Sequence, residues 1–286
     1  MLKRIFVIFL IITGAYIGLS YLLDGYSSSK GKDSAKVSRN TEKIAIDISS
    51  TETAIIPDDR NDVYAELSGK GIVSVDRKGD EIKVTVKQKR FFGFNWSDLD
   101  RPSLAIYIPE DYVRDMEIEL GSGEVKFSGA SAKNPMELNE LEVEIGSGSM
   151  ELENLKVDHF NHESSSGDVK MESIRTGTGS FKVSSGSVKV KDYSGRLDAD
   201  VSSGELEIGM EELKDRINLK VSSGYMGLDL PDDADFYLNG KMSSGDIKCQ
   251  FPLENKSENK NRLSGKHGSG KHEIDADISS GNMKIY

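Results

Sequence analysis

Residues 217–230 read INLKVSSGYMGLDL, and this stretch decides the fold. Apolar side chains alternate on both sides of its glycine but on opposite parities, at Ile217, Leu219 and Val221 before it and at Met226, Leu228 and Leu230 after it. A period of two is typical of a β-strand. The change of parity at Gly224 indicates a bend that turns both strands toward one core. Glycine suits such a bend because it adopts positive φ at no steric cost.

The same serine–glycine corner, flanked by alternating runs, recurs eight times along the chain. Successive corner glycines are 18 to 25 residues apart, except for a last interval of 36. A degenerate first copy without the glycine reads ISST at residues 48–51. Recurrence at a near-constant period is typical of a stacked repeat architecture. The corner glycines are Gly123, Gly148, Gly167, Gly186, Gly204, Gly224, Gly245 and Gly281.

One such repeat cannot fold alone. It buries about five apolar side chains, which contribute roughly 1.5–3 kcal/mol each, whereas ordering its backbone costs roughly 1–2 kcal/mol for each of about twenty residues. Stacking resolves the deficit because each repeat hydrogen-bonds to its neighbours and closes their core. We therefore predict an all-β protein with a repeat β-solenoid over residues 110–286, in which parallel ladders run along the axis.

The serine before each glycine falls on the parity of the buried residues in the preceding strand, so we expect its side chain to point inward. A column of hydroxyls allows two interpretations, a row of nucleophiles or a set of small side chains that satisfy backbone groups at a tight corner. No histidine recurs with the serines to act as a base, so the structural interpretation is favoured. These serines are Ser122, Ser147, Ser166, Ser185, Ser203, Ser223, Ser244 and Ser280.

Residues 5–23 read IFVIFLIITGAYIGLSYLL and carry no charge. At about 1.5 Å per residue, this stretch roughly spans a hydrocarbon core about 30 Å thick. Lys3 and Arg4 precede it, which predicts a cytoplasmic stub at residues 1–4, a single-pass anchor in the cell membrane and an extracytoplasmic C-terminal domain. A cleaved signal peptide is the alternative, although no small-x-small cleavage site follows Leu23. Residues 24–40 are polar and predict a flexible linker.

Residues 41–109 lack the corner but still alternate, so we expect an atypical N-terminal β section that caps the edge of the solenoid. One loop in this section has an unusual density of aromatic residues. It is interpreted either as a contact patch for a partner or as a hydrophobic plug over the end of the core. Its aromatic residues are Phe91, Phe92, Phe94 and Trp96.

The long last interval contains a polar, locally basic insertion at residues 252–271. A solvated loop is the favoured interpretation, and binding of a cell-wall polyanion is the alternative. Tyr286 falls in the final strand of the repeat pattern, which predicts an open sheet edge and end-to-end stacking of molecules.

The composition disfavours several classes of function. A formal net charge of -11 argues against nucleic-acid binding, which depends on Lys and Arg contacts to phosphates. Cys249 is the only cysteine, so no intramolecular disulfide can form. His159 and His162 should point to opposite faces of a strand, which does not favour one metal site. We predict no catalytic, cofactor-binding or metal-binding residues. Rows of acidic side chains are expected to be solubilising at Glu117, Glu119, Glu142, Glu144, Glu205 and Glu207.

Several segments together resemble one known family. These are the Ser-Ser-Gly repeats, the strand that ends at Ile108-Pro109, the LDLPDDADFYL segment at residues 228–238 and the closing GSGKHEIDADISSGNMKI. They are similar to the bacterial "putative adhesin" family of unknown function, over about residues 41–286. The resemblance implies a β-solenoid and carries over no catalytic residues. With a single N-terminal anchor, the chain looks like the LiaG-like membrane proteins of this family, which are encoded beside a cell-envelope stress-response system.

Three functions follow as hypotheses. The favoured one is a non-enzymatic, membrane-anchored, extracytoplasmic structural or interaction module, with envelope proteins or cell-wall polymers as partners and a link to envelope stress. The alternative is a β-helix enzyme that acts on cell-wall polysaccharide, which requires carboxylates in a groove with a bound cation or raised pKa values. The third is a self-assembling scaffold.

Overall fold

The computed structural model describes residues 31–69, 71–87 and 102–286, and every regular element within these ranges is a β-strand. The all-β prediction is therefore confirmed for the described chain. No helix in these ranges has the length and apolarity to cross a membrane. The anchor predicted at residues 5–23 and the aromatic residues Phe91, Phe92, Phe94 and Trp96 lie outside the described residues.

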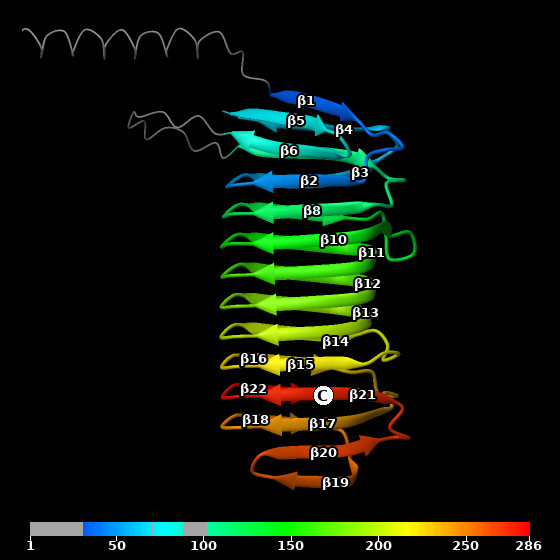
Figure 1. Cartoon of the computed structure of the whole chain (residues 1–286), viewed down its shortest axis with the longest axis vertical. Helices are drawn as coiled ribbons and strands as arrows, with labels where there is room; N and C mark the ends of the chain where they lie inside the picture. Colours follow the sequence, from blue (N-terminus) through cyan, green and yellow to red (C-terminus); the bar gives the residue numbers. More distant parts are fainter. Residues whose placement is uncertain (1–30, 70, 88–101) are drawn as a thin grey trace, which may run out of the picture.

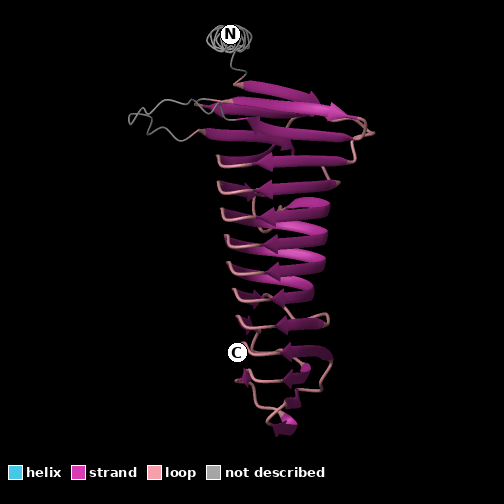
Figure 2. Cartoon of the chain, turned by 60° about the vertical axis from the view of Figure 1, so that its left-hand side comes forward, coloured by secondary structure: helices cyan, strands magenta, loops and turns pink. Residues whose placement is uncertain are grey.

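The strands form a flattened stack of coils (Figure 1). Each coil has a strand on a front face, a serine–glycine corner and a strand on a rear face. Three strands bend around the opposite edge and belong to both faces (Figure 2), namely β11 (Ser149–Ser164), β12 (Asp168–Val183) and β13 (Ser187–Val201).

Stacking order is clearest on the front face, where coils pair in parallel except at the two ends. The outermost pairs at either end are antiparallel. The order is β5 (Ile72–Lys78), β6 (Glu81–Lys87), β2 (Lys43–Ile48), β8 (Asp115–Leu120), β10 (Met136–Ile145), β11, β12, β13, β15 (Ile217–Val221), β21 (His272–Ile278), β17 (Phe236–Met242), β20 (Arg262–His267) and β19 (Glu254–Asn259).

The rear face follows the same stacking. Two antiparallel pairings close its N-terminal end. The order is β1 (Lys32–Lys36), β4 (Asp62–Ser68), β7 (Ser103–Pro109), β3 (Glu52–Asp58), β9 (Glu124–Ser128), β11, β12, β13, β14 (Glu205–Met210), β16 (Tyr225–Asp229), β22 (Asn282–Ile285) and β18 (Asp246–Cys249).

Two coils lie out of chain order. The β21–β22 coil inserts between the β15–β16 coil and the β17–β18 coil, and it pairs in parallel with both. The β2–β3 coil likewise lies between the β6–β7 pair and the β8–β9 coil. The open edge predicted at Tyr286 is therefore wrong, because β22 has a partner strand on each side.

The serine–glycine corner has a different geometry from the predicted one. Val221 is buried, Ser222 and Ser223 are both exposed, and Gly224 is buried again. The parity change therefore occurs across two outward-facing serines, and the prediction of inward-facing corner serines is wrong. The eight serines that precede the corner glycines are all exposed.

The corner glycines form one file along the stack, and their role is close approach rather than positive φ. None of them has a positive φ angle. A Cβ built on Gly224 would lie 2.3 Å from the carbonyl oxygen of Gly204, closer than real Cβ atoms approach. At the inserted coil, a Cβ on Gly281 would lie 2.5 Å from the Gly224 oxygen, and one on Gly245 would lie 2.2 Å from the Gly281 oxygen. At the corner of the β2–β3 coil, Thr51 occupies the position of the glycine and lies next to Gly123.

Positive φ occurs instead at the opposite edge, where β11, β12 and β13 bend from the rear face to the front face. Asn154, Ser173 and Asp192 have φ angles of 56°, 57° and 53°. They are equivalent positions of successive coils, since the residues on either side of them pair in register. Short polar side chains tolerate this conformation better than most other residues.

Antiparallel strands cover the N-terminal end of the described stack on both faces and its C-terminal end on the front face, whereas β18 is the last strand of the rear face. β1 pairs with β4, so Lys32–Lys36 is a strand rather than part of the flexible linker predicted over 24–40. The insertion at 252–271 is not a solvated loop, because β19 and β20 form a hairpin that pairs with β17 and buries Leu263. Lys and Glu side chains line the outer strands, which is a common way to protect a sheet edge.

The core runs the length of the stack as columns of apolar side chains, with Phe127, Phe160 and Phe181 among the largest fully buried ones. His162 is a polar exception. Its ring is 2% exposed, lies 6.1 Å from the Phe181 ring between centroids, and has no hydrogen-bond partner for either nitrogen among the described residues. Burial lowers the pKa of His162 to about 4. The neutral imidazole therefore acts as a core side chain.

Candidate interaction surface

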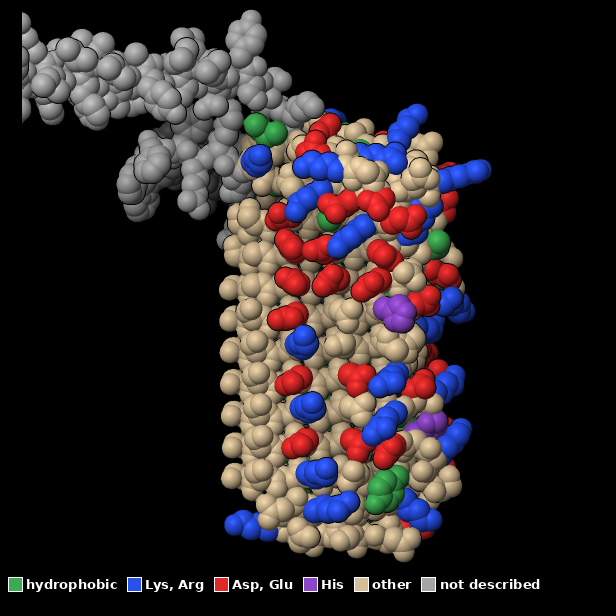
Figure 3. All heavy atoms as spheres, in the orientation of Figure 1, with side chains coloured by type: hydrophobic (Ala, Val, Ile, Leu, Met, Phe, Trp, Pro, Cys, Tyr) green, Lys and Arg blue, Asp and Glu red, His purple; other side chains and the backbone are tan. Residues whose placement is uncertain are grey.

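The front face carries a single file of charged side chains beside the serine–glycine corner (Figure 3). Each residue lies four positions before a corner glycine, except at the terminal hairpin, so the corner register places it on the outward side of its strand. We call this file the charge column. The file starts with the acidic residues Asp47 and Glu119, and the name charge column is kept for the eight members that follow them in stacking order, namely Glu144, Glu163, Lys182, Asp200, Lys220, Asp277, Lys241 and Arg262.

Charges in the middle of this column alternate from coil to coil. All of its members are exposed. Glu163 and Lys182 form an ion pair at 3.8 Å between Oε2 and Nζ. Among the described residues, Asp200, Lys220, Asp277 and Lys241 have no side-chain hydrogen bond or ion pair within 4.0 Å. Their charges are therefore available to a partner.

A second file, two residues before the charge column, is polar and connected. We call it the amide column; in stacking order it consists of Asn161, Ser180, Asp198, Asn218, Asp275 and Asn239. The Nδ2 atom of Asn218 donates to Oδ1 of Asp198 at 2.5 Å, and that of Asn239 donates to Oδ1 of Asp275 at 2.8 Å.

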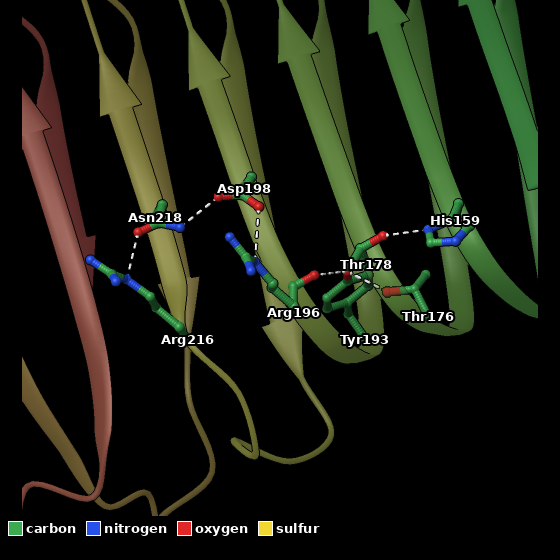
Figure 4. A network of polar contacts seen from close by, with 8 residues as sticks. All are labelled: His159, Thr176, Thr178, Tyr193, Arg196, Asp198, Arg216 and Asn218. Carbon is green, nitrogen blue, oxygen red and sulfur yellow. Dashed lines mark hydrogen bonds and ion pairs between the residues drawn. The ribbon is translucent and has the colours of Figure 1, made fainter.

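Arginines in the next file bind the side chains of the amide column, as Figure 4 shows for Arg196 with Asp198 and for Arg216 with Asn218. Arg196 Nε lies 3.3 Å from Oδ2 of Asp198. Arg216 donates from Nε to Oδ1 of Asn218 at 3.0 Å and from Nη2 to Oδ2 of Asp275 at 2.6 Å. A network of this kind fixes side-chain rotamers before a partner arrives, which lowers the entropy cost of binding.

A buried tyrosine fixes the backbone where the front-face part of β13 begins. The Tyr193 hydroxyl donates to the Arg196 carbonyl at 2.9 Å and lies 2.7 Å from Oγ1 of Thr176. Burial raises the pKa of Tyr193, so it stays a neutral donor. On the neighbouring coils, Nδ1 of His159 lies 3.0 Å from Oγ1 of Thr178. His159 is exposed and His162 is buried, so the prediction that they face opposite sides is confirmed.

Between the two columns runs an open groove of about 470 Å³. Its lining combines free charges of the charge column with bonded groups of the amide column, together with Phe181, Leu219 and two alanines. The groove can therefore bind a polar, extended surface. It is a poor match for an apolar small molecule, whose sites are concave and mostly hydrophobic.

The acidic residues that were predicted to be solubilising lie in two groups on opposite faces. Glu117, Glu119, Glu142 and Glu144 are neighbours on the front face, whereas Glu205 and Glu207 lie on the rear face. A hydrogen bond from Lys43 lowers the pKa of Glu117, and a hydrogen bond shared with Glu117 raises the pKa of Glu119. This pair lies on the open sheet. The described ranges contain no group of three or more His, Cys, Asp or Glu side chains placed to hold a metal ion.

Sequence reasoning identified the corner glycines but missed the two columns. A signal existed, since a charged residue lies four positions before each of the eight corner glycines, beginning with Glu119 before Gly123. Read in chain order, however, the signs run Lys220, Lys241, Asp277, and the alternation is broken. It appears only when the inserted coil places Asp277 between the two lysines.

Residues 41–286 match the family model described as Toastrack DUF4097. The chain belongs to this family. No curated protein matches the sequence.

Solved structures agree with the Toastrack fold. A "putative adhesin" from Parabacteroides distasonis ATCC 8503 is 12% identical with a TM-score of 0.52, over 90% of this chain and 99% of that one. A "putative adhesin" from Bacteroides fragilis NCTC 9343 is 15% identical with a TM-score of 0.50, over 89% of this chain and 96% of that one. At such low identity these likenesses bear on the fold alone. The predicted solenoid and the resemblance to an adhesin-like family of unknown function are confirmed.

Proposed function

We propose that this Toastrack protein is a non-enzymatic interaction module, held at the outer side of the cell membrane by an anchor at residues 5–23. In this proposal it is a LiaG-like membrane protein associated with the envelope stress response. The uncharged apolar stretch and the preceding Lys3 and Arg4 support the anchor and its orientation. In this proposal the tether is shorter than the predicted linker of residues 24–40, because Lys32–Lys36 belongs to the stack.

The observation that carries the proposal is the front face. Its amide column is fixed by hydrogen bonds between coils, and its charge column has free charges on the same rigid sheet. Extended binding surfaces of stacked-repeat proteins are commonly built from residues that recur at one position of each repeat. An envelope protein or a cell-wall polymer would lie along the groove between the columns.

Cross-linking in intact envelopes tests the proposal. Ser180 lines the front groove, and Ser187 faces outward on the rear face of the neighbouring coil. Ser180→Trp fills the front groove, and Ser187→Trp is the matched control. We expect cross-linked partners of the full chain to be recovered with the wild type and the control and to be lost with Ser180→Trp. Equal recovery from both variants would contradict a front-face contact.

The location and the absence of catalysis need separate measurements. Protease added to intact cells should digest the stack and leave the anchor, and protection of the stack would contradict the extracytoplasmic location. Release of soluble sugars from cell-wall polysaccharide by the purified chain would contradict a non-enzymatic role.

A further inference from the structure

The charge column has a symmetry that a solubilising surface does not require. From Glu144 to Arg262 the signs are negative, negative, positive, negative, positive, negative, positive and positive. Read from the opposite end, every sign within these eight residues is inverted. Glu119 and Asp47, which precede them in the file, have no charged counterpart, because Asn259 follows Arg262 at the other end. A two-fold axis along the strand direction, placed between β13 and β15, maps the column onto itself in reverse order. It therefore pairs every residue with one of opposite charge.

We propose that the front face binds the front face of a second copy of this chain, in an antiparallel arrangement about that axis. The inference rests on the proposed function as an interaction module and names its partner. A two-fold contact uses the same patch on both molecules, so each pairing occurs twice. The pairs are Glu144 with Arg262, Glu163 with Lys241, Lys182 with Asp277, and Asp200 with Lys220.

The amide column is compatible with the same axis. Asp198 would face Asn218, and Ser180 would face Asp275. Asn161 would face Asn239, so no two like charges meet in this file. In the next file Arg196 meets Arg216, but each arginine is already bonded to a carboxylate of its own chain, at 3.3 Å and 2.6 Å.

The opposite orientation is disfavoured by the same charges. A two-fold axis along the stack would place coils of equal level against each other. With the axis over the charge column, each residue would face its own copy and every pairing would be repulsive. Like charges in direct opposition disfavour a complex and so select against it. The column thus distinguishes antiparallel from parallel pairing.

Neighbouring coils of one molecule also place opposite charges side by side, about 4.8 Å apart along the stack. This internal arrangement is the competing explanation of the alternation. In the column this arrangement produces one ion pair, between Glu163 and Lys182 at 3.8 Å, and leaves Asp200, Lys220, Asp277 and Lys241 without side-chain partners among the described residues. The experiment must therefore separate pairing within a molecule from pairing between molecules.

Antiparallel pairing has a geometrical consequence. The β1 ends of the two stacks point in opposite directions. With each chain anchored through its N-terminal segment, the pair would connect two facing membranes rather than two neighbours in one membrane. The inferred activity is therefore homophilic contact between surfaces.

Vesicle tethering by the full chain tests this inference. The wild type is reconstituted into two separately labelled populations of phosphatidylcholine vesicles, and co-clustering is measured by fluorescence cross-correlation. Asp200→Lys and Lys220→Asp each turn two central contacts from attraction to repulsion. Because exposed ion pairs contribute little individually, we expect each single variant to weaken self-tethering about tenfold. The double variant, Asp200→Lys with Lys220→Asp, should restore it.

The decisive arm mixes vesicles that carry Asp200→Lys with vesicles that carry Lys220→Asp. Across this pair both central contacts are again opposite in charge, although each molecule keeps its own internal repulsion. Tethering between the two populations should return to the wild-type level. It should also decrease as added salt shortens the Debye length from about 10 Å at 0.1 M to about 3 Å at 1 M.

Three results would overturn the inference: no tethering by the wild type at low salt, single variants that tether as well as the wild type, or no recovery in the mixed population. The last result would assign the alternating charges to the fold of one molecule. Failure of tethering, with envelope cross-links still sensitive to Ser180→Trp, would overturn homophilic pairing alone. Loss of both would overturn the proposed function as well.

Discussion

The two edges of each central coil turn the chain by different means. At the serine–glycine corner, two exposed serines precede a buried glycine of ordinary φ, whose missing Cβ leaves room for the carbonyl of the coil beside it. At the opposite edge, Asn154, Ser173 and Asp192 turn through positive φ with their side chains in place. One edge is limited by the space between coils and the other by backbone conformation. A glycine is thus indispensable at the first edge and merely well suited to the second.

The largest effect that distinguishes the edges is expected from adding one methyl group to the glycine file. Gly204→Ala would place its Cβ 2.5 Å from the Gly186 oxygen and 2.8 Å from a methyl of Val183. Overpacking against backbone should lower the free energy of unfolding by about 3 kcal/mol. Gly209→Ala is the matched control, within the strand β14 that follows Gly204, because its Cβ would meet only the Val190 oxygen, at 3.7 Å. Urea unfolding followed by circular dichroism measures both, and equal midpoints would contradict the close-approach role.

The second largest effect is the pH dependence of stability that comes from His162, in the core between the two edges. The pKa of His162 is about 4 in the folded chain, below the ordinary value of about 6.5, so only the unfolded chain binds a proton between these pH values. Stability from the neutral ring is complete above pH 6.5 and is lost as pH falls. By pH 4.5 the loss should reach about 2–3 kcal/mol. His162→Leu should remove this share of the pH dependence, as read from unfolding midpoints at pH 7 and pH 4.5. An unchanged pH profile in the variant would contradict the buried, unpaired ring.

A smaller effect of opposite sign is expected at the positive-φ edge. Ser173→Gly relieves a left-handed conformation at φ 57°, so it should raise the free energy of unfolding by about 0.5–1 kcal/mol despite the larger entropy of the unfolded chain. The same measurement applies. A loss of stability comparable with that of Gly204→Ala would show that both edges depend on side-chain contacts.

The smallest effect should come from the corner serines themselves. Ser203 is exposed, and no side-chain hydrogen bond is recorded for it in the described chain. Ser203→Ala should change the free energy of unfolding by less than about 0.5 kcal/mol, as is usual for surface sites. A larger loss, measured beside Gly204→Ala, would indicate that the serines stabilise the corner.

The sequence predicted the strands, the corners and the stacking because these depend on local alternation of apolar residues and on repetition. It did not predict the direction of Ser223 or the φ of Gly224, since a change of parity by one position can occur at either residue. The order of the coils along the stack could not be predicted for another reason. β21 and β17 have similar patterns, and only tertiary packing decides which lies beside β15. The charge column depends on that order, so its symmetry was hidden too.

The inserted β21–β22 coil has a consequence for biogenesis. Translation delivers the β17–β18 coil before the β21–β22 coil, which separates it from β16 in the folded chain. Until residues 272–285 arrive, β15 and β17 each present an unsatisfied edge, and their direct pairing would bring Lys220 beside Lys241. Strand β21 carries three acidic residues, and its position between β15 and β17 separates the two lysines. Because like charges on neighbouring strands disfavour pairing, the order with β21 between β15 and β17 is favoured over direct contact of those two strands.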